Sequence, residues 1–268
     1  MSAQLKTNIT EADPNHSSRY ILGLRIDGSN YDDAVERILA MPEKDQFGYV
    51  CIATVHMVME AHDDYSFQRI VNSANLVTSD GMPLVWGLRF QGLTNAQRVY
   101  GPSLTPILCK RAAAMGWPVG FYGGTDEVVD QMKANLSAEI PSLNIAYAYS
   151  PPFHPLTPEE DEAAVRQIRA SGVKILFVGL GCPKQERWMA EHADRVDAVQ
   201  VGVGAAFDFL AGQKAQAPRW VQNAGLEWLF RLATEPRRLW KRYLYHNPRF
   251  IYLYGKQLLT HKLGWGRN

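Results

Sequence analysis

Cysteine and long apolar runs are both scarce in this sequence. The 268 residues include three cysteines, Cys51, Cys109 and Cys182, which lie far apart and form no C-x-x-C pair. This spacing argues against a disulfide framework or a zinc site and fits a reducing cytoplasm. The first residues lack the apolar core of a signal peptide, and no apolar run is long enough to span a bilayer. We therefore expect a cytoplasmic protein that is not integral to a membrane.

The glycine motifs of the common cofactor-binding folds are missing as well. A dinucleotide fingerprint fails at Gly179-Leu-Gly181 and again at Gly202-Val-Gly204, because no third glycine follows either pair at the required spacing. A P-loop is excluded because no Gly-Lys-Ser/Thr occurs. The chain also lacks the Asp-x-Asp with which many nucleotide-sugar enzymes hold a divalent ion. If a diphosphate binds, arginines, lysines and backbone amides must neutralise it, and we expect no metal and no cofactor.

Charge is unevenly distributed along the chain. The composition is that of a soluble globular protein, with 46% hydrophobic and 21% charged residues. From Arg219 onward, ten cations face two acids, so this segment carries +8, whereas residues 1–218 carry −7, for the total of +1. A basic segment on an acidic body indicates that the segment meets an anionic partner.

Strand-like apolar runs alternate with segments of helical spacing. Strands are expected at residues 20–26, 49–53, 76–78, 118–122, 143–147, 173–178 and 198–203. Helices are expected at residues 31–41, 56–73, 103–115 and 185–193, after the cap residue Thr125, from the capping box at Thr157, and from Pro236. The alternation predicts an α/β fold, a Rossmann-like parallel sheet flanked by helices.

Three regions follow from this pattern. Residues 1–18 are polar and are expected to form a disordered leader. Residues 19–218 form the Rossmann-like body, and residues 219–268 form a basic, aromatic-rich helical appendage.

Polar residues follow several of the expected strands. Parallel strands present their carboxyl ends at one edge of the sheet, where nucleotides bind, so these residues are expected to converge. They are Thr54, His56, Asp80, Gly123, Gly124, Gly181, Pro183, Lys184, Gln185, Glu186 and Asp208. Asp80 could act as a general base on an acceptor hydroxyl, or it could be a turn aspartate that bonds its own backbone. Thr54 and His56 could orient a substrate, or they could cap the next helix.

The appendage interleaves aromatic side chains with its cations. This composition is typical of a helix that lies in a membrane interface. Arginines and aromatics would also suit nucleic acid, but the body is acidic and no RNA-binding motif is present. An amphipathic helix packed on the body with a solvated basic face is a further alternative. We prefer an anionic membrane surface as the partner.

Taken together, these segments resemble the WecG/TagA/CpsF glycosyltransferase family of bacterial cell-surface polysaccharide synthesis. The resemblance covers about residues 20–250 in the family's order. The matching segments are Thr54-Val-His-Met, Ser79-Asp-Gly-Met-Pro-Leu, Arg98-Val-Tyr-Gly, Phe121-Tyr-Gly-Gly, Ser150-Pro-Pro-Phe, Val178-Gly-Leu-Gly-Cys-Pro-Lys-Gln-Glu, Gly202-Val-Gly-Ala-Ala-Phe-Asp-Phe, Ala217-Pro-Arg-Trp, Gly225-Leu-Glu-Trp-Leu-Phe-Arg-Leu and Glu235-Pro-Arg-Arg-Leu-Trp-Lys-Arg-Tyr.

The resemblance implies an inverting, metal-independent enzyme that transfers a sugar from a UDP-sugar to a polyprenyl-diphosphate-linked sugar. By that resemblance, Asp80 is the general base and Thr54 helps to position the substrate. Arg98 and Gln185 line the donor site. The appendage arginines Arg231, Arg238 and Arg242 reach the lipid diphosphate. One position departs from the family: members that act on N-acetylmannosamine typically have Thr-x-Asn where this chain has Thr54-Val-His56, so we expect a hexose or another exopolysaccharide sugar.

Our hypothesis is a peripheral enzyme on the inner face of the bacterial plasma membrane, whose appendage docks on the anionic leaflet. Homo-oligomerisation is possible, because the aromatic appendage could bury itself in a neighbouring subunit. A rival from another class is a non-catalytic scaffold that binds nucleotide-sugars in a polysaccharide assembly complex. A UDP-sugar epimerase or dehydrogenase is a further rival, and the failed glycine fingerprints count against it.

Overall fold

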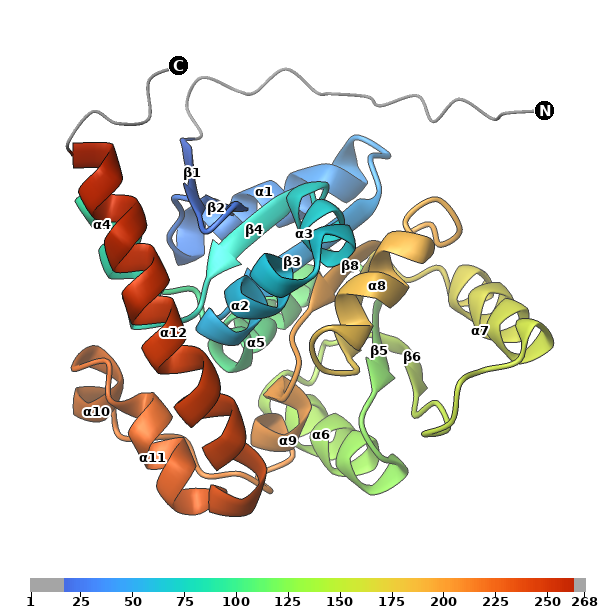
Figure 1. Ribbon diagram of the computed structural model, residues 1–268. Coiled ribbons are helices and arrows are strands. Elements are labelled where there is room, and N and C mark those ends of the chain that lie inside the picture. The colour runs from blue at the N-terminus through green and yellow to red at the C-terminus, as the bar shows by residue number, and fades with distance from the viewer. Residues whose placement is uncertain (1–16, 263–268) are drawn as a thin grey trace.

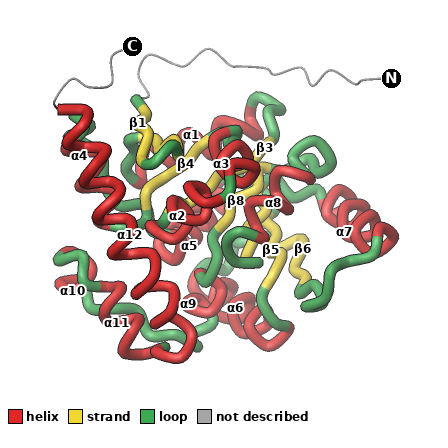
Figure 2. The backbone as a smooth tube through the Cα atoms, in the orientation of Figure 1, coloured by secondary structure: helices red, strands yellow, loops and turns green. Residues whose placement is uncertain are grey.

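The computed structural model describes residues 17–262, apart from the side chains of Arg219, Asn223, His261 and Lys262. Most of the leader predicted at residues 1–18 lies outside these described residues, and Ser18 already opens a strand. Figure 2 shows the strands enclosed between helices, which confirms the predicted α/β class.

A six-stranded, wholly parallel sheet forms the middle layer, in the order β4-β3-β8-β7-β5-β6. Each strand lies within two or three residues of its predicted position, because buried parallel strands read as short apolar runs. Their bounds are β3 (Gly48–Ala53), β4 (Leu76–Ser79), β5 (Val119–Gly123), β6 (Ile145–Tyr149), β7 (Ile175–Gly179) and β8 (Val199–Gly202).

Helices cover both faces of the sheet (Figure 1). One face carries α2 (Val55–Asp63), α3 (Tyr65–Asn72), α7 (Pro158–Ser171) and α8 (Lys184–Glu191). The other face carries α1 (Tyr31–Glu43), α5 (Gly101–Ala114), α6 (Asp126–Glu139) and α9 (Ala206–Leu210).

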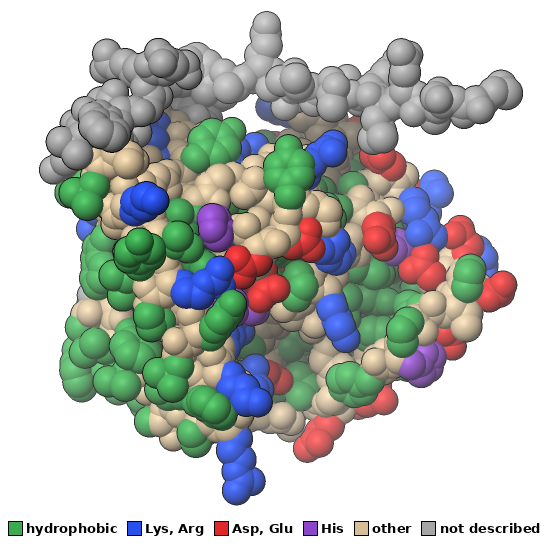
Figure 3. All heavy atoms as spheres, in the orientation of Figure 1, with side chains coloured by type: hydrophobic (Ala, Val, Ile, Leu, Met, Phe, Trp, Pro, Cys, Tyr) green, Lys and Arg blue, Asp and Glu red, His purple; other side chains and the backbone are tan. Residues whose placement is uncertain are grey.

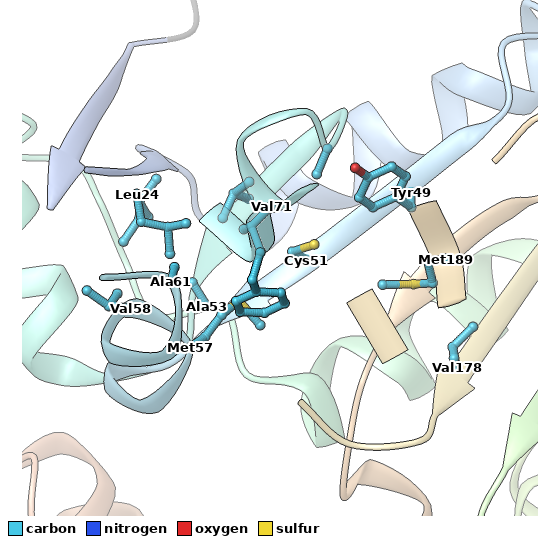
Figure 4. Close-up of a cluster of buried hydrophobic side chains, with 14 of the residues drawn as sticks. Leu24, Tyr49, Cys51, Ala53, Met57, Val58, Ala61, Val71, Val178 and Met189 are labelled. Carbon is cyan, nitrogen blue, oxygen red and sulfur yellow. The ribbon is translucent and has the colours of Figure 1, made fainter. Parts of the chain in front are cut away.

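The core is divided by the alternation of side chains along the strands. In β3, Tyr49, Cys51 and Ala53 face α2, α3 and α8, whereas Val50 and Ile52 face the opposite helices. Figure 4 shows the first set packed with residues of the helices and of neighbouring elements. The sheet is thus buried on both faces.

Two predicted elements were wrong, each because a local turn divides it. The single strand expected at residues 20–26 is a hairpin of β1 (Ser18–Ile21) and β2 (Leu24–Asp27), which turns at Gly23 with φ of 85°. The helix expected at residues 56–73 ends at Asp63, and Asp64 caps α3 by accepting a hydrogen bond from the Phe67 amide. The helix α4 (Met82–Phe90) was not predicted.

The appendage consists of α10 (Arg219–Asn223), α11 (Glu227–Thr234) and α12 (Pro236–Lys262). Figure 1 shows α12 as a long helix along one side of the body. Its residues Phe250 and Tyr254 are buried in the same apolar cluster as α2 and α4. The appendage is therefore packed into the body rather than held away from it. Among the described residues, no helix is both long and apolar enough to cross a bilayer.

Candidate active site

The predicted convergence at the carboxyl edge of the sheet is present in the structure. A cavity of about 810 Å³, which we call the sheet-edge cavity, lies where β3, β4, β5, β7 and β8 end. The predicted residues on its wall are Thr54, Asp80, Gly124, Gly181, Lys184, Gln185, Asp208, Arg231, Arg238 and Arg242. The last three come from the appendage, so α11 and α12 close one side of this cavity.

Thr54 and Asp80 are held side by side by the sheet. The backbone amide of Asp80 donates to the carbonyl of Ala53 at 2.8 Å, which continues the pairing of β3 with β4 by one residue. Thr54 caps α2, since its Oγ1 accepts a hydrogen bond from the Met57 amide at 3.3 Å. The capping role and a place on the cavity wall are compatible.

Arg98 fixes the carboxylate of Asp80. Its Nη2 and Nε lie 2.9 Å and 3.0 Å from Asp80 Oδ1, and Nε also donates to the Asp80 carbonyl at 2.6 Å. Among the described residues, Oδ2 of Asp80 accepts no hydrogen bond, so one carboxylate oxygen remains available at the cavity. The ion pair with Arg98 therefore orients the Asp80 carboxylate without occupying both of its oxygens.

The same guanidinium ties Asp80 to the appendage. Arg98 Nη2 lies 2.5 Å from Glu227 Oε2, and Nη1 donates to Gln222 Oε1 at 3.2 Å. The guanidinium also lies over the ring of Tyr100, 4.2 Å from its centroid. Burial alone would lower the pKa of Arg98, but the carboxylates of Asp80 and Glu227 outweigh it and raise that pKa.

Glu227 and Gln222 were not predicted as parts of the site. The signal for Glu227 was its charge, since it is one of two acids in a strongly basic segment. An acid surrounded by many cations is expected to form an ion pair, but the sequence alone does not indicate which cation is its partner.

Gln185 holds two loops of the sheet-edge cavity together. Its Oε1 accepts hydrogen bonds from the amides of Gly181 at 3.2 Å and Gly204 at 3.1 Å. Its Nε2 donates to Glu186 Oε1 at 2.7 Å. Three of the four hydrogen bonds open to this amide are therefore used within the protein, which makes Gln185 a positioning residue for the glycine loops.

Glu186, a predicted donor-binding residue, does not reach the cavity in this structure. Its side chain is fully buried and lies behind the cavity wall, where it accepts the bond from Gln185. Burial raises the pKa of Glu186 to about 7, although the hydrogen bond from Gln185 acts in the opposite direction.

Two further predicted donor residues, Pro183 and Gly123, also lie outside the lining of this cavity. Pro183 immediately precedes α8. Gly123 has φ of 131°, and a Cβ there would stand 2.5 Å from the carbonyl oxygen of Gly179. Gly123 is therefore required for the close approach of two loops, and its effect on a ligand is indirect.

Aromatic side chains, which the sequence analysis did not identify, form another part of the wall. Tyr122 and Trp188 both line the cavity, and their rings stack with centroids 4.4 Å apart. Trp188 in turn stacks on His192 at 4.1 Å. Nearby, the predicted Asp208 is paired with Lys214, whose Nζ lies 2.5 Å from Oδ2.

The three appendage arginines meet at the opposite wall. The Nε atoms of Arg231 and Arg242 are buried without a hydrogen-bond partner among the described residues. Arg238 is held by Glu235, with Nε 2.6 Å from Oε2. Burial is the main cause that lowers the pKa of Arg242, and the charges of the other two arginines add to it. Buried cations with unused donors favour an anionic ligand.

A second cavity of about 750 Å³ lies on the appendage side of Asp80, and we call it the appendage cavity. Its lining is largely apolar and includes Trp86, Phe90, Leu226, Trp228, Leu244 and Ile251. Thr54, Asp80, Arg231 and Arg242 line both cavities, so the two spaces meet at these residues.

His56 and Arg98, both predicted at the donor site, line the appendage cavity and not the sheet-edge cavity. His56 Nδ1 lies 3.6 Å from Glu60 Oε1, and the ring is 5.0 Å from that of His246. Burial, together with the neighbouring Arg242 and His246, lowers the pKa of His56 to about 3. His56 is therefore neutral at pH 7.

The chain matches the model of a known protein family. The model described as "Glycosyl transferase WecG/TagA/CpsF family" matches residues 19–264, which is nearly the whole chain. The match spans the body and the appendage together, so both cavities and their junction lie within it.

Proposed function

The chain belongs to the WecG/TagA/CpsF glycosyltransferase family, and we propose that it transfers a sugar from a UDP-sugar to a polyprenyl-diphosphate-linked saccharide. The transfer inverts the anomeric carbon, needs no divalent ion at the donor diphosphate, and serves cell-surface or exopolysaccharide synthesis. One observation carries the proposal: a cavity at the sheet edge and a largely apolar cavity share Asp80, Arg231 and Arg242, and the Nε atoms of both arginines lack a hydrogen-bond partner among the described residues.

The sheet-edge cavity suits the donor. Its volume of about 810 Å³ lies within the ordinary range for small-molecule sites, and its glycine loops allow the main chain to approach a phosphate closely. The stacked rings of Tyr122 and Trp188 give one side of this cavity a rigid aromatic border against which a donor could pack edge-on. Because the chain has no Asp-x-Asp, Lys184 and the backbone amides of the glycine loops supply the charge and the donors that the donor diphosphate requires.

The appendage cavity suits the lipid-linked acceptor. Its apolar lining fits a prenyl chain, and the shared residues Arg231 and Arg242 stand at the end where a diphosphate would follow that chain. The acceptor sugar then points towards Asp80, with the donor on the other side. This arrangement gives each of the two substrates its own space and one shared reaction centre.

The proposed step is a single displacement. Asp80 Oδ2 takes the proton of the acceptor hydroxyl while that oxygen attacks the anomeric carbon of the donor sugar. The bond from that carbon to the diphosphate oxygen breaks, and its electron pair leaves with UDP. Arg98 keeps Asp80 oriented through Oδ1, and Lys184 and the glycine-loop amides stabilise the charge that develops on UDP.

The outer surface of the appendage supports a peripheral place at the membrane. Figure 3 shows hydrophobic side chains gathered over α11 and α12. Exposed residues in this region include Trp228, Leu229, Trp240, Leu244, Ile251 and Tyr252. Basic residues of α12 accompany them, and this combination suits the inner, anionic leaflet.

The test is UDP release from a panel of UDP-sugars, with polyprenyl-diphosphate-linked saccharide in liposomes and with Mg²⁺ and Mn²⁺ withheld. Wild type should release UDP in an acceptor-dependent manner. Asp80→Asn should release it at least about 100-fold more slowly, because the general base is lost. Asp130→Asn, which removes an exposed carboxylate from α6, is the matched control and should behave as wild type.

The anomeric configuration of the product, read by NMR, tests the inversion. Retention would contradict the single displacement. UDP binding without release from any donor would favour the non-catalytic scaffold instead, and release that survives Asp80→Asn would move the base to another residue.

A further inference from the structure

Two histidines and a glutamate meet where α12 crosses α2, outside the proposed transfer chemistry. His56 and Glu60 lie one turn apart on α2, and His246 comes from α12. His56 Nδ1 and His246 Nε2 each lie 3.6 Å from Glu60 Oε1. One ligand atom from each residue lies within 4.8 Å of the other two.

These contacts are too long to be hydrogen bonds. At 3.6 Å neither imidazole nitrogen bonds the carboxylate, and His56 Nδ1 is buried with no hydrogen-bond partner among the described residues. Buried polar atoms are normally satisfied, so this arrangement calls for a partner that can bind all three groups at once. The contact between the two histidine rings does not satisfy the nitrogens.

Two of the three ligand separations match those around a small cation, and the third, between the two histidines, is within 4.8 Å. Zinc bonds imidazole nitrogen and carboxylate oxygen at about 2.0–2.2 Å, so two of its tetrahedral ligands stand about 3.4 Å apart. The two distances of 3.6 Å are close to that value. Both histidines also line the appendage cavity, from which a water molecule could complete the tetrahedron.

The ligand types select among metals. Magnesium and calcium prefer oxygen ligands, whereas two imidazoles and one carboxylate form a set that zinc commonly uses. Arg242 lies beside both histidines, and its positive charge repels a second cation. A metal that is attracted by charge alone would therefore bind poorly at this site. Arg249 opposes it less, because a bidentate pair with Asp63, at 2.8 Å for each contact, offsets its charge.

We propose that His56, Glu60 and His246 bind a zinc ion that pins the appendage helix α12 to helix α2 of the body. The site lies next to the junction of the two cavities: His56 follows Thr54 by two residues, and His246 lies one turn from Arg242. The zinc therefore fixes Arg242 relative to Thr54 and Asp80. It has a structural role and takes no part in the displacement at the donor.

The first experiment measures zinc in full-length protein purified without a polyhistidine tag. Wild type should bind one zinc per chain after addition of zinc and removal of the excess. Cobalt(II) in its place should give the visible absorption of a four-coordinate nitrogen and oxygen site. The metal content of the chain, rather than its activity, is the readout, so the result is independent of the proposed transfer reaction.

Variants assign the ligands. His56→Asn, His246→Asn and Glu60→Gln should each weaken zinc binding at least about tenfold, since each removes one of three protein ligands. His62→Asn, an exposed histidine on the same helix, is the control and should bind as wild type. Zinc at about 100 times its Kd should raise the Tm of wild type by roughly 5 °C, and that of the ligand variants by less.

Melting in EDTA separates metal binding from folding. In EDTA, the ligand variants that fold should have a Tm close to that of wild type, because neither protein then holds zinc. If one ligand variant fails to fold, the two others carry the test. Absence of zinc binding by wild type at micromolar concentration, or undiminished binding by His56→Asn and His246→Asn, would overturn the proposal.

Discussion

A single amide side chain, Gln185, connects the glycine loops of the sheet-edge cavity to a buried carboxyl group. Its two loop contacts fix Gly181 and Gly204, and its third contact reaches Glu186. The Oε2 atom of Glu186 is buried without a partner among the described residues. An ionised carboxylate in such a place costs stability, and the raised pKa of Glu186 records that cost.

At this residue scale we predict a pH-dependent stability that originates at Glu186. Its pKa is about 7 in the folded chain, against an ordinary value of 4.5. Between these values the folded chain holds a proton that the unfolded chain has lost. The free energy of unfolding therefore falls by up to about 3 kcal/mol as pH rises from about 4.5 to 7. Above pH 7 it stays at this lower value.

The variant Glu186→Gln tests this prediction, because it keeps the acceptor for Gln185 and cannot ionise. Denaturant unfolding at pH 8 should show the variant more stable than wild type, and the gain should vanish at pH 5. The control Glu43→Gln removes an exposed carboxylate at the end of α1 and should show no such dependence. Equal gains at both pH values would contradict the assignment to Glu186.

At the scale of elements, α12 is attached to the body by two kinds of contact. The ion pair between Arg249 and Asp63 is bidentate, but both side chains are partly exposed. Phe250 and Tyr254 are buried in the apolar cluster of the body. Exposed ion pairs contribute about 0–1 kcal/mol, whereas burial of an aromatic ring contributes several times more. Apolar packing therefore dominates the docking of α12.

From this comparison we predict that Phe250→Ala lowers the free energy of unfolding by about 3–5 kcal/mol, while Arg249→Gln lowers it by less than about 1 kcal/mol. Denaturant unfolding of the two variants beside wild type measures both effects. A larger loss for Arg249→Gln than for Phe250→Ala would mean that charge, rather than packing, holds this helix.

At the scale of the whole molecule, the basic appendage and the acidic body place opposite charges on two parts of one protein. The exposed apolar side chains on α11 and α12 lie on the basic part. Deleting the appendage is a poor test of membrane docking, because the loss of Phe250 and Tyr254 would expose the body's core. Substitutions on its outer surface test docking with the core intact.

We predict that Trp240→Glu combined with Tyr252→Glu weakens binding to anionic liposomes at least about tenfold in sedimentation assays, since both side chains are exposed aromatics that line neither cavity. Binding by wild type should weaken with added salt, because attraction to the anionic surface is screened. Tyr65→Glu, which changes an exposed aromatic on α3, is the matched control. Unchanged liposome binding by the double variant would exclude this surface as the docking face.

The amino-acid sequence by itself determined the local parts of this protein. Apolar runs and helical spacing predicted the parallel sheet, and the polar residues at the strand ends predicted Thr54 and Asp80 as neighbours. These predictions succeeded because strand and helix patterns depend on residues close together in the chain. Parallel strands then bring their carboxyl ends to one edge whatever the details of packing.

Only the tertiary structure decided which distant residues meet. Glu227 reaches Arg98, His246 reaches Glu60, and Glu186 is buried beneath the cavity wall rather than exposed on it. Each of these outcomes depends on the path of the appendage or on the depth of a helix in the core. Such contacts join segments far apart in sequence, and the free energy of packing the whole chain selects them, so no local pattern encodes them.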